Sequence, residues 1–236
     1  MPDQFLRMEM ILGKEAMRQL HNAHVAVFGI GGVGGYAAEA LARSGVGAIT
    51  LVDHDAVALT NLNRQAEALH STLRQPKVQA MAQRILDIYP DCKVEARMDY
   101  YSADTREKFF DGCYDYIIDA IDLVSCKLDL IETALNRNIP IISALGTGNK
   151  LRLSGFRTAD ISETSGCPLA RIIRRELRRR GIYHHKVIFS PELPAKIAPG
   201  ETPPPGRRSV PASVPWVPGS VGFMLAGEVV LALAGQ

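Results

Sequence analysis

The chain has 236 residues, of which 47% are hydrophobic and 22% charged, and its formal net charge at pH 7 is +2. A chain of this length and composition can bury a substantial core, which excludes a disordered or fibrous protein. A net charge this small does not by itself indicate nucleic-acid binding. The distribution of charge along the chain has to decide that question.

The cysteine content and the N-terminus both indicate a cytoplasmic protein. None of the four cysteines forms a C-x-x-C pair, which argues against a zinc knuckle. The first residues lack the long apolar stretch of a signal peptide. A chain of this kind fits a reducing compartment, so we expect cytoplasmic localisation.

The first 150 residues alternate short apolar runs with longer amphipathic ones, the pattern of a doubly wound α/β fold. Pro76 suits the first turn of its helix, where a missing N–H is harmless. We expect a Rossmann-like, mostly parallel sheet whose loops gather the ligand site along one edge. Strands are predicted over His24–Gly29, Ala48–Asp53, Lys93–Arg97, Tyr114–Asp119 and Pro140–Ala144, and helices over Val33–Ser44, Pro76–Tyr89 and Val124–Asn136.

The last third of the chain has a different pattern. Residues 150–157 alternate like an antiparallel strand, 168–180 form an arginine-rich helix, and 191–218 are rich in proline and predict a surface loop. The apolar run 219–235 contains Glu228 and is marginal in length for a membrane span, so a buried or interface helix is favoured. We expect a single domain over 1–236, with a core over about 20–148 that holds the ligand site and a C-terminal extension over about 149–236 for dimer and substrate contacts.

A glycine-rich loop follows the first predicted strand, with glycines at positions 29, 31, 32 and 34. Glycines let the backbone approach a phosphate closely, and the following helix offers free N–H groups. Asp53, at the end of the next strand, is placed to bind ribose hydroxyls. A glycine turn without a ligand, or a nicotinamide or flavin dehydrogenase, would show the same loop.

The polar residues that follow the second strand favour adenylation over hydride transfer. Arg64 and Lys77 would supply positive charge as pyrophosphate leaves, and Asn61 a neutral donor. Asp122, after the fourth strand, would supply an anion that holds Mg²⁺ against the phosphates. Each residue could instead be a surface charge or a helix cap. The full set is Asp53, Asp55, Asn61, Arg64, Gln65, Lys77 and Asp122.

These motifs, in this order and spacing, resemble those of the ubiquitin-activating-enzyme superfamily, which includes the ThiF, MoeB and HesA adenylyltransferases. The resemblance covers about residues 4–160. It implies ATP and Mg²⁺ as cofactors, with the nucleotide bound by the glycines, Asp53, Asp55, Asn61, Arg64, Gln65 and Lys77, and the metal by Asp122. It also implies that Arg7 reaches into the site of a neighbouring subunit, which requires a homodimer. The alternative is that Arg7 lies in a mobile tail.

Three features bear on the carboxylate that is activated. The zinc cysteines usual in sulfur-carrier adenylyltransferases are absent. Cys126 and Cys167 lie in no motif of a thioester-forming nucleophile, and a lone cysteine is more often a small core residue. The helix after residue 167 carries a dense basic set, which suits RNA phosphates as well as it suits a solvated face. Its predicted RNA-binding residues are Arg171, Arg174, Arg175, Arg178 and Arg179.

The chain as a whole resembles the bacterial tRNA threonylcarbamoyladenosine dehydratases. The resemblance implies ATP-dependent cyclisation of a threonylcarbamoyl group on tRNA, with net loss of water. Some relatives have a cysteine shortly before the C-terminal helix, whereas residues 209–216 contain none, so direct attack on the acyl-adenylate is favoured. The alternatives are adenylation of a small ubiquitin-like sulfur carrier, with a sulfur-relay or sulfur-carrier protein as partner, and a non-catalytic nucleotide- or RNA-binding module. We expect no membrane association.

Overall fold

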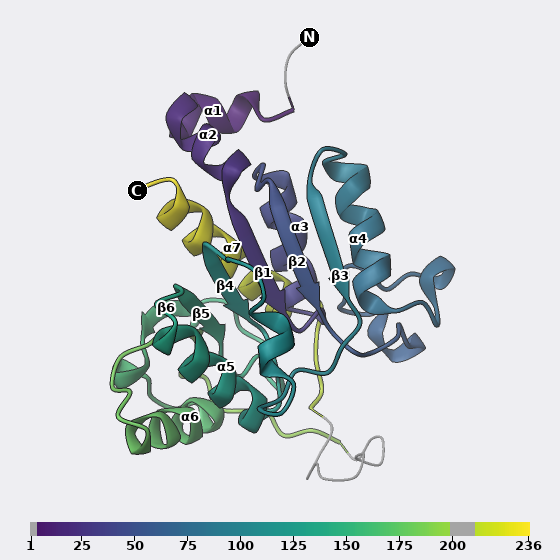
Figure 1. Ribbon diagram of the computed structural model, residues 1–236. Helices are drawn as coiled ribbons and strands as arrows, with labels where there is room; N and C mark the ends of the chain where they lie inside the picture. The colour runs from purple at the N-terminus through teal and green to yellow at the C-terminus, as the bar shows by residue number, and fades with distance from the viewer. Residues whose placement is uncertain (1–3, 199–210) are drawn as a thin grey trace.

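The computed structural model describes residues 4–198 and 211–236. A single seven-stranded sheet crosses the molecule in the order β3-β2-β1-β4-β5-β7-β6 (Figure 1). All neighbouring strands are parallel except β6 and β7, which are antiparallel. The strands are β1 (His24–Phe28), β2 (Ala48–Val52), β3 (Lys93–Arg97), β4 (Tyr116–Asp119), β5 (Ile141–Ala144), β6 (Arg157–Asp160) and β7 (Lys186–Phe189).

Helices cover both faces of the sheet, as the alternating sequence pattern predicts. Successive residues of β1 point to opposite faces: Val25 and Val27 pack into one hydrophobic cluster, and Ala26 and Phe28 into the other. The first cluster includes residues of α3, α4 and α7, and the second includes residues of α5 and α6. The helices are α1 (Leu6–Leu12), α2 (Lys14–Asn22), α3 (Gly34–Arg43), α4 (Lys77–Ile88), α5 (Val124–Asn136), α6 (Pro168–Arg179) and α7 (Trp216–Leu233).

Four short 3-10 helices lie in three of the connections, two of them between β2 and α4. They are η1 (Leu59–Asn61), η2 (His70–Thr72), η3 (Arg106–Phe109) and η4 (Ile161–Glu163). The expected doubly wound fold is therefore confirmed, and the sheet extends across the boundary near residue 149 between the predicted core and extension. Pro76 is the residue before α4 and not part of its first turn.

The antiparallel strand was predicted in the wrong place. The strand is β6, which begins at Arg157, whereas residues 150–156 form no strand. The backbone N–H groups of Leu151 and Arg152 donate to the Glu192 carboxylate, 3.2 Å each, in place of a neighbouring strand. The strand β7, against which β6 pairs, was not predicted at all.

The C-terminal apolar run forms α7, which begins at Trp216, inside the predicted loop 191–218. Residues 199–210 of that loop lie outside the described residues. By length and composition α7 is, among the described helices, the one candidate for a membrane span, but half of it is buried within the fold. Gly222 allows the close contact with α3, because an added Cβ would lie 2.4 Å from the Val33 carbonyl oxygen. The helix α7 therefore packs as a core helix of the fold.

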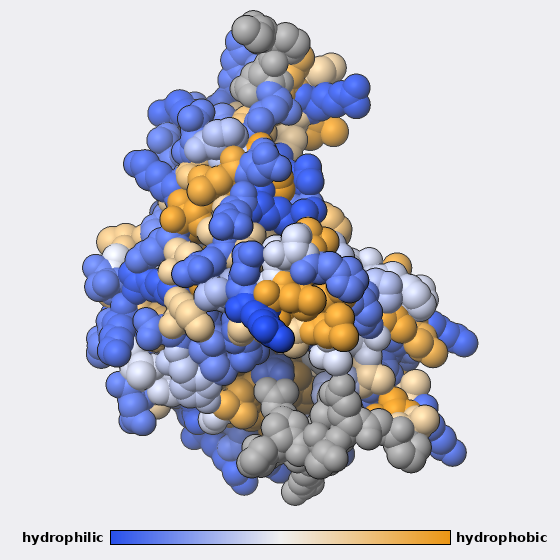
Figure 2. Space-filling model, turned by 90° about the vertical axis from the view of Figure 1, so that its right-hand side faces the viewer, coloured by the Kyte–Doolittle hydropathy of each residue, from blue (hydrophilic) through white to orange (hydrophobic). Residues whose placement is uncertain are grey.

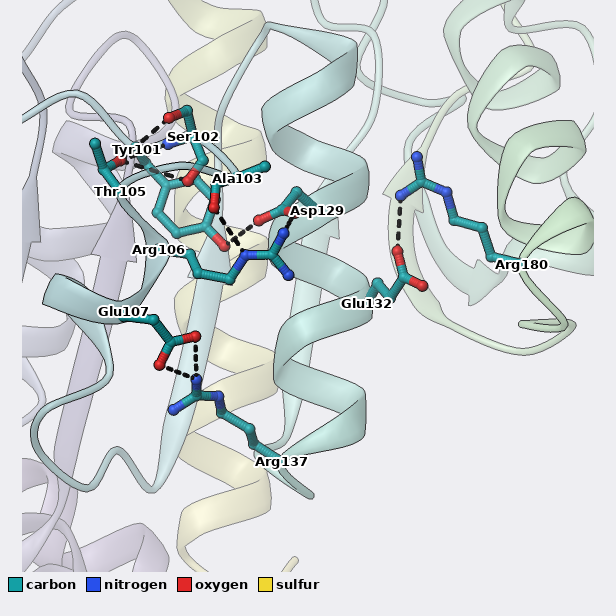
Figure 3. Close-up of polar contacts among 10 residues, drawn as sticks. All are labelled: Tyr101, Ser102, Ala103, Thr105, Arg106, Glu107, Asp129, Glu132, Arg137 and Arg180. Atoms are coloured by element: carbon teal, nitrogen blue, oxygen red, sulfur yellow. Dashed lines mark hydrogen bonds and ion pairs between the residues drawn. The ribbon is translucent and has the colours of Figure 1, made fainter.

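Salt bridges and hydrogen bonds fix α5 against its neighbours (Figure 3). Asp129 accepts a hydrogen bond from the Tyr101 hydroxyl at 2.8 Å and pairs with Arg106 at 2.8 Å. Glu132 pairs with Arg180, just after α6, at 2.9 Å. The two helices of this face are therefore linked by charge as well as by apolar packing.

Candidate active site

A cavity of about 960 Å³ lies at the carboxyl ends of the parallel strands. This is the edge at which doubly wound folds bind ligands. Loops that follow β1, β2, β4 and β5 all contribute to its walls. Of the residues predicted for the site, the cavity is lined by Gly29, Gly31, Gly32, Asp53, Asp55, Asn61, Arg64, Gln65, Lys77 and Asp122.

The glycine loop is tightly packed against the end of β4. Gly29 has a positive φ of 89°, and an added Cβ there would lie 2.8 Å from the Ala120 carbonyl oxygen. At Gly34 an added Cβ would lie 1.8 Å from the Gly29 carbonyl oxygen. Gly34 is not among the cavity-lining residues, so its role is to let the loop fold back on itself.

Asp53 ties the glycine loop to the end of β2. Its carboxylate accepts hydrogen bonds from the Ile30 N–H at 2.7 Å and from the Asp55 N–H at 2.8 Å. Burial raises its pKa, although Lys77 and these two N–H groups oppose that effect. Asp53 therefore shapes the nucleotide side of the cavity and also lines it.

The predicted cations lie on the same wall as the glycine loop. The Lys77 ammonium, at the start of α4, is almost fully buried and pairs with Asp55 at 2.9 Å. The Arg64 guanidinium donates to the Thr60 carbonyl oxygen at 2.8 Å and to Asn63 Oδ1 at 2.9 Å. These contacts hold both cations in place before a ligand binds, which is what stabilisation of a developing phosphate charge requires.

The amide side chains of this wall are also positioned. Asn61 accepts a hydrogen bond from the Ala58 N–H at 2.9 Å through Oδ1, which fixes the orientation of its amide. Gln65 is buried beside Gly31, and its Oε1 has no hydrogen-bond partner among the described residues. A ligand that donates to this oxygen would remove the cost of leaving it unpaired.

Asp122 lines the cavity at the end of β4, beyond a buried polar network. In that network Asp119 accepts hydrogen bonds from Lys127 and Ser143, each at 2.6 Å, and from the Ile121 N–H at 3.0 Å. Both Asp119 and Lys127 are fully buried. The network therefore fixes the turn that carries Asp122, and one carboxylate beside bound phosphates is a donor set that suits Mg²⁺.

A second group of residues suits a metal as well. Ligand atoms of Asp53, His54 and Asp55 lie within 4.8 Å of one another. Asp55 already pairs with Lys77, and Asp53 already accepts two backbone N–H groups. Two of the three residues in this group are therefore already engaged in contacts within the chain.

The predicted arginine finger lies at the opposite end of the sheet from the cavity. Arg7 is an exposed residue of α1, and α2 connects α1 to the amino end of β1. The two helices lie beyond the end of the sheet opposite the cavity (Figure 1). Arg7 is not among the cavity-lining residues, so it contributes nothing to the site of its own chain in this arrangement.

The five predicted RNA-binding arginines come together on one side of α6. They line a shallow hollow of about 420 Å³. Two of them are partly neutralised, because Arg175 and Arg179 both pair with Glu176. Arg174 donates to Thr164 and is held inward, whereas the side chains of Arg171 and Arg178 make no hydrogen bond or ion pair with a described residue.

Two buried groups near the cavity carry no signal in the sequence and were not predicted. Glu67 lies against Gly35 behind the glycine loop, 2% exposed, and neither carboxylate oxygen has a hydrogen-bond partner among the other described residues. Burial raises its pKa to about 8. Lys150, after β5, lines the cavity with Cys126 and Cys167. No local motif identifies either group, because burial depends on contacts distant in sequence.

Comparisons with known proteins agree with this geometry. The chain matches the ThiF family over residues 4–236. A tRNA threonylcarbamoyladenosine dehydratase of Bacillus subtilis is 46% identical, over 98% of this chain and 94% of the relative. The protein of that name from Escherichia coli is 40% identical, over 71% of this chain and 63% of the relative. A molybdopterin-synthase adenylyltransferase of Salmonella typhimurium is 33% identical, over 60% of this chain and 55% of the relative.

A solved structure extends the likeness to three dimensions. The crystal structure of the E. coli dehydratase TcdA in complex with ATP superposes with a TM-score of 0.88 at 32% identity, over 98% of this chain and 94% of that chain. The resemblance expected from the motifs is confirmed over nearly the whole length, well beyond residues 4–160. The chain therefore belongs to the ThiF family.

Proposed function

We propose that this protein is an ATP-dependent enzyme that adenylates the carboxylate of a threonylcarbamoyl group on tRNA and cyclises it. The observation that carries the proposal is the cavity in which Asn61, Arg64, Lys77 and Asp122 meet the glycine loop. A dehydrogenase has no use for two fixed cations and an amide donor at this wall. An adenylating enzyme needs them as charge grows on the leaving pyrophosphate.

The reaction has two steps. A substrate carboxylate oxygen attacks the α-phosphorus of ATP, a bond forms between them, and pyrophosphate leaves. A nucleophile within the threonylcarbamoyl-adenosine unit then attacks the acyl carbon, and AMP leaves with the bridging oxygen. Counted from the carboxylic acid, the oxygen lost with AMP, the carboxyl proton and the proton lost from the nucleophile together account for the net loss of water. None of these steps needs a covalent cysteine.

The residues of this chain would share the work of the first step. The β- and γ-phosphates would be held by Arg64, Lys77 and the Asn61 amide. The backbone N–H groups of the glycine loop would bind the phosphates as well. Asp53 binds the ribose. Asp122 would hold Mg²⁺, which when bound would offset the charge on the phosphates.

A homodimer would complete the site. Because Arg7 lies at the far end of the sheet from the cavity of its own chain, it can act only in the cavity of a second subunit. The helix that carries it has an exposed apolar surface, with Met10 80% and Ile11 84% exposed. Apolar side chains are also visible on the surface at the top of the molecule, where α1 lies (Figure 2). A partner subunit would cover such a patch.

The tRNA backbone would lie on the arginines of α6. Five guanidinium groups along one side of a single helix form a positive surface suited to phosphates. The same RNA would bring the modified adenosine to the cavity. A protein that acts on tRNA in this way would be cytoplasmic.

The test is to incubate the protein with ATP, Mg²⁺ and tRNA that carries the linear threonylcarbamoyl group, and to analyse the nucleosides by mass spectrometry. We expect the modified adenosine to lose the mass of one water, with AMP formed in equal amount. An unchanged nucleoside would refute the proposal. Pyrophosphate exchange that depends on a carrier protein ending in Gly-Gly, and not on RNA, would favour the alternative function, adenylation of a small ubiquitin-like sulfur carrier. The similarity to a molybdopterin-synthase adenylyltransferase supports that alternative.

A further inference from the structure

Lys150 differs from the other buried lysines of the described residues in having no carboxylate partner. Lys77 pairs with Asp55 at 2.9 Å and Lys127 with Asp119 at 2.6 Å. Lys150 is 2% exposed, and its ammonium donates to the Ser190 carbonyl oxygen at 2.7 Å. No described carboxylate lies within ion-pair distance of it. A buried cation that lacks a counter-ion is costly to the fold and marks a place where an anion is expected.

The surroundings of Lys150 hold its ammonium at the cavity wall. Lys150 lines the cavity together with Gly146, Thr147 and Gly148 of the loop that follows β5. Its ammonium lies over the Phe156 ring, 5.3 Å from the ring centroid, which gives a weak favourable cation–π contact. Burial lowers the pKa of Lys150, although Cys167 and Glu192 oppose that effect, and a bound anion would raise the pKa further.

The loop that carries Lys150 is itself anchored. The Asn149 backbone accepts a hydrogen bond from the Ala195 N–H at 2.7 Å and donates to the Ala212 carbonyl oxygen at 2.8 Å. The Asn149 side chain accepts from the Ala212 N–H at 2.7 Å, and the Trp216 indole donates to the Leu151 carbonyl oxygen at 2.8 Å. The wall around Lys150 is thus built from segments on both sides of residues 199–210.

The position of Lys150 in the sheet separates it from the phosphate contacts. The glycine loop follows β1, Asp122 follows β4, and Lys150 follows β5, which is two strands away from β1. With neighbouring strands about 4.8 Å apart, the two loops leave the sheet roughly 10 Å apart. In the proposed function Arg64 and Lys77 bind the phosphates. An anion at Lys150 would therefore be a group other than the phosphates, and it would lie beyond Asp122 as seen from the glycine loop.

We propose that Lys150 binds the carboxylate of the acyl substrate before it is adenylated. This inference rests on the proposed function, because it takes a carboxylate as the group to be activated. A cation is needed there, since a carboxylate and a triphosphate repel each other as they approach. Once the acyl-adenylate forms, the carboxylate charge is gone, so Lys150 favours the substrate and not the product. Lys150 is therefore a specificity residue for the acid.

The experiment measures binding of an anticodon hairpin that carries threonylcarbamoyladenosine either as the free acid or as its methyl ester. We expect the wild-type protein to prefer the acid by about 10- to 100-fold, the effect of one hydrogen bond to a charged group. Lys150→Gln and Lys150→Met should abolish this preference, and Lys150→Arg should retain most of it. Lys108→Gln, an exposed lysine outside the cavity, is the matched control.

Two further readouts separate a binding role from a structural one. The Tm of each variant shows whether it is folded, and its affinity for ATP should stay within about twofold of wild type, well below the tenfold that 1.4 kcal/mol represents. A folded Lys150→Gln protein that still prefers the acid would overturn the inference, and so would one whose ATP affinity falls in parallel.

The outcome also distinguishes this inference from the proposed function. If the wild-type protein dehydrates the modified tRNA but Lys150→Gln keeps the acid preference, only the role of Lys150 is wrong. If the wild-type protein neither dehydrates the tRNA nor prefers the acid to the ester, the proposed function and the inference both fail.

Discussion

The two sides of the cavity differ in how their charges are compensated. On the nucleotide side Lys77 has Asp55 at 2.9 Å, and the Asp53 carboxylate has two backbone N–H groups. On the side formed by the loop after β5, the Lys150 ammonium has one carbonyl oxygen. On the nucleotide side the buried Lys77 ammonium is paired with a carboxylate, whereas on the other side the buried Lys150 ammonium has no carboxylate within ion-pair distance among the described residues. In a protein built this way, ATP binding and substrate choice can be altered separately.

The strongest test of the nucleotide side is to remove one of its charges. We expect Arg64→Ala and Asp122→Ala each to lower the rate of adenylation by about 10²- to 10³-fold, because each removes a charge fixed at the phosphates. The measurement is ATP–pyrophosphate exchange in the presence of modified tRNA.

Asp91→Ala, at an exposed turn outside the cavity, is the control for the aspartate variant. Full turnover in either Arg64→Ala or Asp122→Ala would show that adenylation does not depend on these charges. The assignment of this side of the cavity to the nucleotide would then be wrong.

The next test asks whether the nucleotide side is completed by a second subunit. Arg7→Ala should keep the dimer and lose on the order of 10²-fold in rate, the effect of removing a transition-state cation. Mixing Arg7→Ala with Asp122→Ala protein should then restore activity, because each mixed dimer contains one cavity with both residues intact.

At equal amounts and with free subunit exchange, about half of the dimers are mixed, and activity should reach about one quarter of wild type. A mixture no more active than its components would show that Arg7 does not act in trans.

Glu67 is the exception to the pairing on the nucleotide side, and it predicts a pH effect on stability. Its pKa is about 8 in the folded protein, whereas an unperturbed glutamate side chain has a pKa of 4.5. Between these values the folded state holds a proton that the unfolded state releases, so stability falls as pH rises from 4.5 to about 8.

Glu67→Gln removes this dependence, since the amide does not ionise. We expect it to raise the free energy of unfolding near pH 8 by about 4 kcal/mol and to have little effect near pH 4.5. Denaturant unfolding at the two pH values measures this. An equal change in the free energy of unfolding at the two pH values would show that Glu67 is not protonated in the folded protein.

The smallest expected effect belongs to the arginine surface of α6. Arg171→Gln and Arg178→Gln should each weaken tRNA binding severalfold and lower the slope of log affinity against log salt by about 0.7 to 0.9, the loss of one phosphate contact. Arg18→Gln, exposed on α2, is the control. An unchanged salt dependence in both variants would identify the surface as a solvated face.

The motifs of the nucleotide side could be predicted because they are local. The glycine loop, Asn61, Arg64 and Lys77 follow two strands whose apolar runs fix their ends, and parallel strands bring those ends to one edge. Their roles remain predictions, but their convergence on one cavity is what the structure shows.

The other side could not be predicted in the same way. Lys150 lies in a run that alternates like a strand, yet its neighbours bind Glu192 and Ala212, residues distant in sequence. The buried pair of Asp119 and Lys127 likewise arises from packing between β4 and α5. Whether a polar side chain is buried, and whether it has a partner, depends on tertiary contacts that periodicity does not encode.

The central claim is that this cavity joins AMP to a carboxylate, and an oxygen-18 transfer experiment tests it most directly. Modified tRNA whose threonyl carboxylate carries oxygen-18 would be incubated with the protein, ATP and Mg²⁺, and the AMP analysed by mass spectrometry. The account predicts that AMP carries oxygen-18 from the carboxylate, because the bridging oxygen leaves with the phosphate. AMP that forms without the label would contradict it.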